Sequence, residues 1–399
     1  MGTGATGPAS TPRAAPAPRR LLLLFALVSL LIYGAVVFLN VRHYGGNLSS
    51  LIQLGDSAIP TEKEPGGFGH HVVVFRHSAG YDGQTYYYVA DDPFLRRRAF
   101  HSPQRYGRIG YPLLIWALTR GQRNARPVAM VAINLVAVAA VAYLAGLIVA
   151  LVGRGGGMWW ALAAALNPSL LIAVQKDLAE PLMMALTLAG LLLYLRRRIL
   201  WAALLFAAAL LTREVAVLFL LPLLTAEVWA RRAWPAAALA LSAGPYLDWQ
   251  AVVARALGQS SATATQGQFG PPLSGIDAAV RVALHAPDHR TYWATLMVVV
   301  AFVGAALVVS AIYLWRRPDI LTGGMVAHGI AALCTGPAIW LGFDNIARVY
   351  GGLYLLTVFA YVRYRRRPLA LLCGVVVLLS LLTFLRIATT SAAPYYLTP

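Results

Sequence analysis

The chain has 399 residues, of which 59% are hydrophobic and only 12% are charged. An average soluble domain carries about 25% charged residues, so this composition excludes an ordinary soluble fold. The net charge of +18 would suggest nucleic acid as a partner of a soluble protein. Here the arginines stand in short groups at the ends of apolar runs, which indicates membrane topology. We therefore expect no nucleic-acid partner.

Apolar runs recur along almost the whole chain, close to the roughly 20 residues that an α-helix needs to cross a bilayer. Clear examples are residues 21–39, 127–152, 292–314 and 369–385. We predict an all-α polytopic membrane protein with about eleven transmembrane helices. These helices form a single transmembrane domain over residues 21–386.

Basic clusters set the expected orientation of these spans. They close successive apolar runs at residues 196–198, 231–232, 316–317 and 363–367. Short cytoplasmic turns are enriched in such residues, so we place all of these clusters in the cytoplasm.

The two ends of the chain follow from this orientation. Residues 1–20 are rich in Pro, Ala, Gly and Thr, and we expect a disordered cytoplasmic segment before an uncleaved signal anchor. Residues 387–399 become an extracytoplasmic tail. Arginine far outnumbers lysine, which favours a bacterial source and hence the bacterial cytoplasmic membrane.

Two long polar stretches are expected outside this membrane. Residues 42–126 form the first extracytoplasmic loop, and residues 248–290 form the second. Within the first loop, residues 110–118 are apolar but cover only half a membrane. Such a segment is typical of a helix that lies at the interface.

The first loop also holds the densest group of residues with chemical potential. It combines carboxylates, tyrosines and arginines, namely Tyr81, Asp82, Tyr86, Tyr87, Asp91, Asp92, Arg105 and Arg108. In glycosyl transfer a carboxylate can take the proton of the acceptor hydroxyl, and arginines can pair with the phosphate of a lipid-linked donor. Composition alone fits equally well an interfacial segment with an aromatic belt and solvated charges.

Histidines and cysteines do not indicate a metal centre or a disulfide framework. The first loop contains His70, His71, His77 and His101, whose spacing matches no metal-binding motif, so we expect no metal. Cys334 and Cys373 lie inside apolar runs, where cysteine behaves as a small buried hydrophobic residue.

Several short motifs follow one another in a characteristic order. Residues 81–121 contain Asp-Gly-x-x-Tyr-Tyr, Asp-Pro-Phe, Arg-x-x-Arg and Tyr-Pro-Leu-Leu. Further motifs are Asn-Pro-Ser at 167–169, Lys-Asp-Leu-x-Glu-Pro at 176–181, Leu-Thr-Arg-Glu at 211–214 and Asp-Asn-x-x-Arg at 344–348. This order resembles the C-type (GT-C) superfamily of membrane glycosyltransferases. It is similar in particular to the GPI mannosyltransferases and to bacterial membrane proteins linked with cell-surface glycopolymer formation.

The resemblance implies a helical membrane bundle and a polyprenyl-phosphate sugar as donor. It also implies a catalytic carboxylate in the first external loop, which would be Asp82. Tyr81 departs from the pattern, because the eukaryotic mannosyltransferases have Trp at that position. Asp91 and Asp92 are alternatives for the catalytic role.

Charged residues at the expected ends of later spans are costly and tend to be functional. Asp177 and Glu180 are expected one helical turn apart on one face, where Lys176 could simply pair with them. Arg213 and Glu214 form either a salt bridge with each other or a phosphate site.

Arg348, four residues after Asp344, has the same ambiguity, and the resemblance favours a contact with the lipid phosphate. The expected donor-phosphate ligands are Arg105, Arg108, Arg213 and Arg348. The expected sugar or acceptor contacts are Tyr81, Tyr86, Tyr87, Asp177, Glu180, Glu214 and Asp344.

We expect an enzyme that moves a sugar from a polyprenyl phosphate to a glycan or lipid-linked acceptor outside the membrane. The resemblance further implies that the reaction is inverting. The enzyme needs no cofactor besides the lipid-linked donor, and its partners are membrane lipid and the acceptor. The alternatives are a lipid-glycan flippase or other transporter, and a non-catalytic scaffold for envelope assembly. A transporter would favour a polar pathway at the membrane midplane, whereas the polar residues here gather in one external loop.

Overall fold

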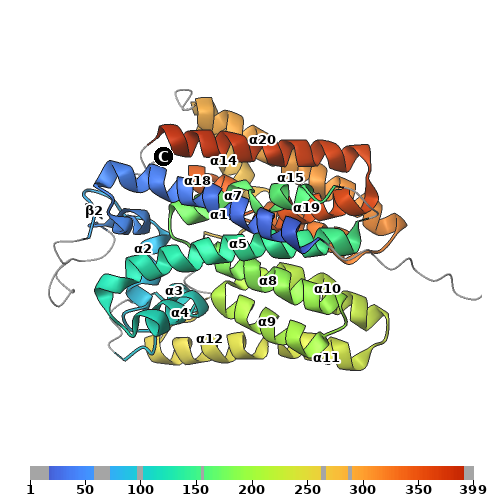
Figure 1. Ribbon diagram of the computed structural model, residues 1–399, viewed down its shortest axis with the longest axis horizontal. Helices are drawn as coiled ribbons and strands as arrows, with labels where there is room; N and C mark the ends of the chain where they lie inside the picture. Colours follow the sequence, from blue (N-terminus) through green and yellow to red (C-terminus); the bar gives the residue numbers. More distant parts are fainter. Residues whose placement is uncertain are drawn as a thin grey trace, which may run out of the picture.

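The computed structural model describes residues 18–57, 72–96, 102–153, 157–261, 267–285 and 290–390, and nearly all of their secondary structure is helical (Figure 1). The helices are α1 (Arg19–Val41), α2 (Asp82–Val89), α3 (Pro103–Tyr106), α4 (Gly110–Thr119), α5 (Arg126–Val152), α6 (Trp160–Ala165), α7 (Pro168–Gln175), α8 (Glu180–Leu195), α9 (Ile199–Thr212), α10 (Val217–Trp229), α11 (Ala233–Leu241), α12 (Gly244–Leu257), α14 (Ser274–His285), α15 (Arg290–Arg316), α16 (Ile320–Leu333), α17 (Pro337–Trp340), α18 (Phe343–Arg348), α19 (Gly351–Tyr364) and α20 (Arg367–Thr389). Short 3₁₀ turns include η1 (Arg42–Tyr44), η2 (Leu48–Ile52), η4 (Arg123–Ala125) and η5 (Glu214–Ala216). Strands β1 (Leu54–Gly55) and β2 (Val74–Phe75) form one short parallel pair. The predicted all-α class is confirmed.

Four helical segments are long and apolar enough to cross a membrane, and they contain α1, α5, α15 and α20. At about 1.5 Å per residue, the 27 residues of α5 extend about 40 Å, more than the roughly 30 Å hydrocarbon core of a bilayer. Shorter apolar helices, α4, α8, α9 and α16, accompany them. The chain is therefore a membrane-embedded helical protein. The apolar segment that we expect at the interface forms α4, a helix of 10 residues.

Two predicted continuous spans are interrupted. The run over residues 158–174 is divided into α6 and α7, because the Asn167 side chain accepts a hydrogen bond from the Leu170 backbone and starts a new helix with Pro168 in its first turn. The run over residues 320–341 likewise stops at the end of α16, and α17 begins separately at Pro337. Both interruptions lie near the polar residues described below.

The second predicted loop, residues 248–290, is more helical than expected. Helix α12 continues from the preceding span as far as Leu257, and α14 covers much of the rest. Polar composition misled the prediction here, because α12 carries charged residues such as Asp248 and Arg255 on its exposed side while other residues pack against α3. The predictions for residues 1–17 and 391–399 lie outside the described residues.

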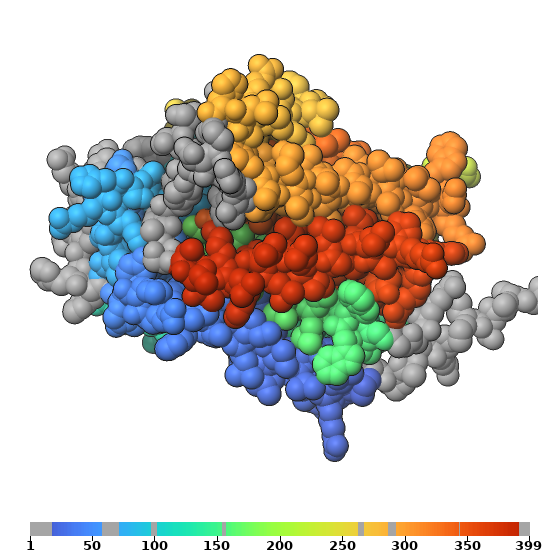
Figure 2. Space-filling model, turned by 90° about the horizontal axis from the view of Figure 1, so that it is seen from above, coloured from blue at the N-terminus to red at the C-terminus, as the bar shows by residue number. Residues whose placement is uncertain are grey.

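Helix α5 lies at the centre of the bundle and contacts α1, α8 and α6 (Figure 1). Gly146 of α5 allows the close approach of α1, since a Cβ there would lie 2.5 Å from a methyl carbon of Leu22. On one face of the molecule α20 lies between α1 and α15 (Figure 2). These contacts bury the apolar faces of long helices against one another.

The basic turns gather at one end of the bundle. Glu227 joins two of them, because its carboxylate lies 3.4 Å from Arg197 and 3.2 Å from Arg232. Arg363 pairs with Asp319 at 2.8 Å and so brings the α15–α16 turn beside the end of α19. Figure 1 shows α1 beginning at this end, whereas α2, α3 and β2 lie at the opposite end. This common end is what a cytoplasmic face requires.

We predict that the α2 end is external and the basic end is cytoplasmic. With Cys334 and Cys373 replaced by Ala, a membrane-impermeant maleimide should label Ala79→Cys in intact cells, because Ala79 is exposed at the α2 end. Arg196→Cys, exposed at the basic end, should be labelled only after permeabilisation. The reverse pattern would contradict the orientation.

Candidate functional site

Asp82 is the first residue of α2, which lies at the end of the bundle away from the basic turns (Figure 1). A Cβ on the next residue, Gly83, would lie 2.5 Å from the carbonyl oxygen of Lys176 and 2.8 Å from that of Ile52. Glycine is therefore needed for α2 to approach both backbones. This contact fixes Asp82 beside the turn between α7 and α8.

The Asp82 carboxylate bridges two guanidinium groups. Arg105 Nη1 donates to Oδ1 at 2.6 Å, and Arg348 Nη2 donates to Oδ2 at 3.1 Å. The exposed fraction of the side chain is 19% for Asp82 and 3% for Arg348. Residues from α2, α3 and α18, distant in sequence, thus meet at one carboxylate.

Glu180 extends this cluster to a third arginine. Its carboxylate pairs with Arg213 and lies 3.4 Å from Nε of Arg348. Nη1 of Arg348 is buried and makes no hydrogen bond within the part of the chain that is described. A buried donor without an acceptor is costly. An anion at this position would remove that cost.

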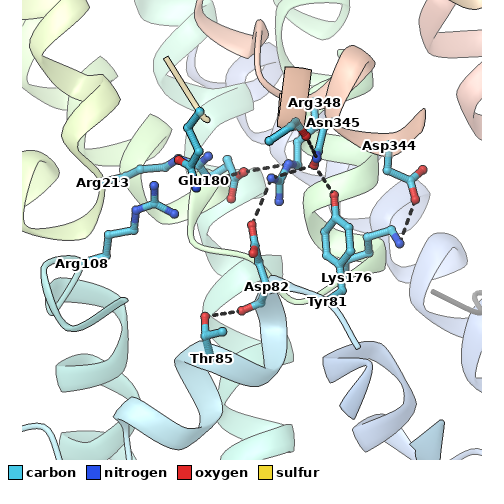
Figure 3. A network of polar contacts seen from close by, with 12 residues as sticks. Tyr81, Asp82, Thr85, Arg108, Lys176, Glu180, Arg213, Asp344, Asn345 and Arg348 are labelled. Atoms are coloured by element: carbon cyan, nitrogen blue, oxygen red, sulfur yellow. Dashed lines mark hydrogen bonds and ion pairs between the residues drawn. The ribbon is translucent and has the colours of Figure 1, made fainter. Parts of the chain in front are cut away.

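A fourth arginine lies at the edge of the same cluster. Arg108 donates two hydrogen bonds to Glu214, at 2.9 and 2.5 Å. Figure 3 shows the guanidinium groups of Arg108 and Arg213 beside each other. One alternative was a salt bridge between Arg213 and Glu214. The structure does not show it, because each of the two residues bonds to a different partner.

The arginines control the charge of the carboxylates. Burial alone would raise the pKa of Asp82, but the positive charges of Arg105 and Arg348 lower this pKa far below its ordinary value. Burial likewise opposes ionisation of Glu214, and Arg108 lowers the pKa of Glu214 to about 2. Both carboxylates are thus ionised at neutral pH.

Tyr81 and Tyr86 face the cluster from α2 and the residue before it. The Tyr81 ring lies 4.0 Å from Nζ of Lys176 and 5.1 Å from the Arg348 guanidinium, and its hydroxyl donates to Asn345 at 2.6 Å. The contact with this ring and a hydrogen bond that Arg348 donates to Asn345 at 3.1 Å orient the guanidinium. The buried Tyr86 hydroxyl makes no hydrogen bond to any described residue.

Lys176 belongs to a second network beside the first. It pairs with Asp344 at 2.8 Å, and Asp344 also accepts from Arg386 at 2.6 Å. Burial opposes ionisation of Asp344, but the two cations lower its pKa well below the ordinary value. The structure thus corrects two alternatives: Lys176 does not pair with Asp177 or Glu180, and Arg348 does not pair with Asp344. This network holds α18 against α20 and the α7–α8 turn.

The prediction that Asp177 and Glu180 share one helix face is wrong. The φ of +51° at Asp177 places this residue in a left-handed turn after α7 has ended. The carboxylate accepts from Asn134 at 3.0 Å, and Asn134 also donates to the Tyr111 hydroxyl at 3.1 Å. Asp177 is therefore buried against α5, on the other side of the turn from Glu180.

Asp91 and Tyr87 lie beside the start of α5 instead, and Asp92 makes a local contact within the loop. Asp91 pairs with Arg123 at 2.7 Å and with Arg126 at 2.5 Å. Asp92 accepts from the Arg96 backbone at 2.8 Å, and the Tyr87 ring lies 5.4 Å from the Arg126 guanidinium. These contacts anchor the loop to the bundle. Of the three aspartates, Asp82 is the one that the structure brings to the arginine cluster.

Several residues of the site had no signal in the sequence. Asn345 stands out only as part of the Asp-Asn-x-x-Arg motif. Gln53 bonds Lys176 at 3.0 Å from a segment with no motif. Arg386 ends an apolar run, where arginine indicates topology. Among the histidines, His70, His71 and His101 lie outside the described residues.

No protein-family profile, curated protein sequence or solved structure matches this chain. What the cluster can do chemically is therefore indicated by its geometry: it can hold an anion and present one ionised carboxylate beside it.

Replacing Asp344 by Ala should lower the free energy of unfolding by about 3–5 kcal/mol, because Lys176 is left buried without its carboxylate. The matched control is Asp277→Ala, which removes a surface pair with Arg281 and should cost at most about 1 kcal/mol. Thermal unfolding in detergent micelles compares the two. Equal midpoints would show that the Lys176 network does not hold the site together.

Proposed function

We propose that the protein is a glycosyltransferase of the GT-C type that takes its sugar from a polyprenyl phosphate. About eleven spans cross a bacterial cytoplasmic membrane by this account, including the shorter apolar helices. The N-terminus is cytoplasmic and the α2 end faces outside. The product is a glycan or glycolipid of the cell envelope.

The observation that carries this proposal is the ionised Asp82 carboxylate between Arg105 and Arg348, with two further arginines close by. Guanidinium groups bind phosphate with two parallel hydrogen bonds. Their position at one end of a bundle of apolar helices suits a ligand with a lipid tail and a phosphate head. The unsatisfied Nη1 of Arg348 supplies a donor for that phosphate.

In the proposed reaction the acceptor hydroxyl oxygen forms a bond to the anomeric carbon of the donor sugar. The bond between that carbon and the phosphate oxygen breaks, and polyprenyl phosphate leaves with one additional negative charge. Asp82 takes the proton of the acceptor hydroxyl. The arginines hold the phosphate both in the bound donor and in the leaving polyprenyl phosphate.

Donor binding also prepares Asp82 for this role. In the free protein the arginines lower the pKa of Asp82 so far that its carboxylate is a weak base. A donor phosphate competes for the same guanidinium groups, so part of their charge is directed away from Asp82. The carboxylate then becomes more basic when a donor is present.

Asp82→Asn removes the proton acceptor and keeps the size of the side chain. We expect turnover with a polyprenyl-phosphate sugar to fall by roughly 10² to 10⁴. Turnover is expressed per amount of folded protein, because the lost charge also bridges Arg105 and Arg348 and its removal lowers stability. Asp92→Asn is the control, since Asp92 binds a backbone amide outside the cluster. Full transfer by Asp82→Asn together with loss of transfer by Asp92→Asn would move the catalytic role along the loop.

Arg105 offers the cleanest test of phosphate binding, because it is less buried than Arg348 and contacts Asp82 from a short helix. Arg105→Ala should raise the KM for the donor roughly 10- to 100-fold, as expected for loss of a charged hydrogen bond. The effect on kcat should be smaller, because a phosphate ligand holds the ground state and the transition state nearly alike. Arg105→Lys should restore binding only in part. An unchanged donor KM in Arg105→Ala would make this arginine a plain ion-pair partner of Asp82.

A further inference from the structure

A pocket opens beside the arginine cluster, on the side of α12. Its volume is about 360 Å³, which is room for one or two sugar rings. The lining residues come from α3, η5, α12 and the segments after α12: Gln104, Gly107, Glu214, Tyr246, Gln250, Ser260, Ser261 and Phe269. Apart from Glu214, none of these residues belongs to the cluster around Asp82.

The lining combines neutral hydrogen-bonding groups with aromatic rings. The amides of Gln104 and Gln250 and the hydroxyl of Ser261 can both donate and accept hydrogen bonds. The rings of Tyr246 and Phe269 offer apolar faces, and Phe269 is 60% exposed. A sugar ring carries hydroxyl groups around its edge and apolar C–H groups on its faces, so this lining matches a saccharide.

The polar side chains are held in place by the backbone of α3. Gln250 donates to the Gly107 carbonyl oxygen at 3.1 Å, and Ser261 donates both to Gln250 and to the Pro103 carbonyl oxygen. A Cβ on Gly107 would lie 2.6 Å from the Gln250 amide, so glycine permits this contact. A pocket built on such contacts needs little reordering to bind a ligand.

The pocket and the cluster share two structural elements. Gln104 lines the pocket, and its neighbour Arg105 binds Asp82. Glu214 lines the pocket with its carboxylate held by Arg108. A ligand in the pocket therefore lies next to the site where the donor phosphate is expected.

We propose that this pocket binds the acceptor and that the acceptor presents a neutral saccharide there. Glu214 is the one charged residue among the lining residues described, and its charge is paired with Arg108. The lining therefore offers hydrogen bonds to sugar hydroxyls but no cation to pair with an acidic sugar or a phosphate. The assignment of this saccharide as the acceptor rests on the proposed glycosyl transfer. Binding of the saccharide itself does not.

The test measures binding of soluble methyl glycosides of disaccharides to the full chain in lipid nanodiscs. Saturation-transfer NMR detects the binding. The panel contains neutral disaccharides of mannose, galactose, glucose and arabinose, and a glucuronic-acid disaccharide of similar size. At least one neutral disaccharide should bind, and the acidic one should bind more weakly. Phe269→Ala and Gln250→Ala should each weaken binding about tenfold, the loss expected for one good contact.

The matched control is Phe94→Ala, because Phe94 lines a neighbouring apolar groove and is 48% exposed. Its binding of the neutral disaccharide should equal that of the wild type. If no neutral disaccharide binds, if the acidic one binds most tightly, or if Phe269→Ala binds as well as Phe94→Ala, the pocket is not a saccharide site.

Measuring sugar transfer and disaccharide binding on the same wild-type preparation separates this inference from the proposed enzymatic function. If the wild-type protein binds the disaccharide but transfers no sugar, the proposed enzymatic function is wrong and the saccharide site remains. If the protein transfers sugar but binds no disaccharide, the enzymatic function remains and the pocket is not a saccharide site.

Discussion

The organisation of this end of the protein depends on one partly buried ionic bridge, in which Asp82 accepts from Arg105 and from the buried Arg348. Buried charges are stable only when they are paired and hydrogen-bonded. The elements that carry these residues are therefore forced together, although they lie far apart in the sequence. Glu180 and the Lys176 network continue the same pairing, so that α2, α3, α8 and α18 converge around a group of arginines.

This pairing leaves the cluster ready for an anion. Each carboxylate occupies part of a guanidinium that could bind phosphate, and a buried donor on Arg348 is still unsatisfied. A phosphate would exchange one set of ion pairs for another without exposing the arginines to lipid. The neutral pocket on the α12 side has a different chemistry. Under the proposed function, the cluster suits a charged donor and the neighbouring pocket suits an uncharged acceptor.

The sequence predicted the helical membrane class and the short apolar helix α4, because composition carries those signals. The convergence of Asp82, Arg105, Arg213 and Arg348 was expected from the roles that the resemblance implies, since composition alone fitted solvated charges equally well. The sequence did not predict which ions pair. Asp177 and Glu180 look like neighbours on one helix, but the left-handed turn at Asp177 sends them in opposite directions. The pocket was also missed, since Gln250 and Phe269 acquire their meaning only when α12 packs against α3.

The most direct measurement is a structure of the protein in nanodiscs with a bound polyprenyl-phosphate sugar. The account predicts the phosphate within hydrogen-bonding distance of Arg105 and Arg348, with the anomeric carbon turned toward Asp82. A phosphate bound at the opposite end of the bundle, beside Arg197 and Arg232, would contradict it.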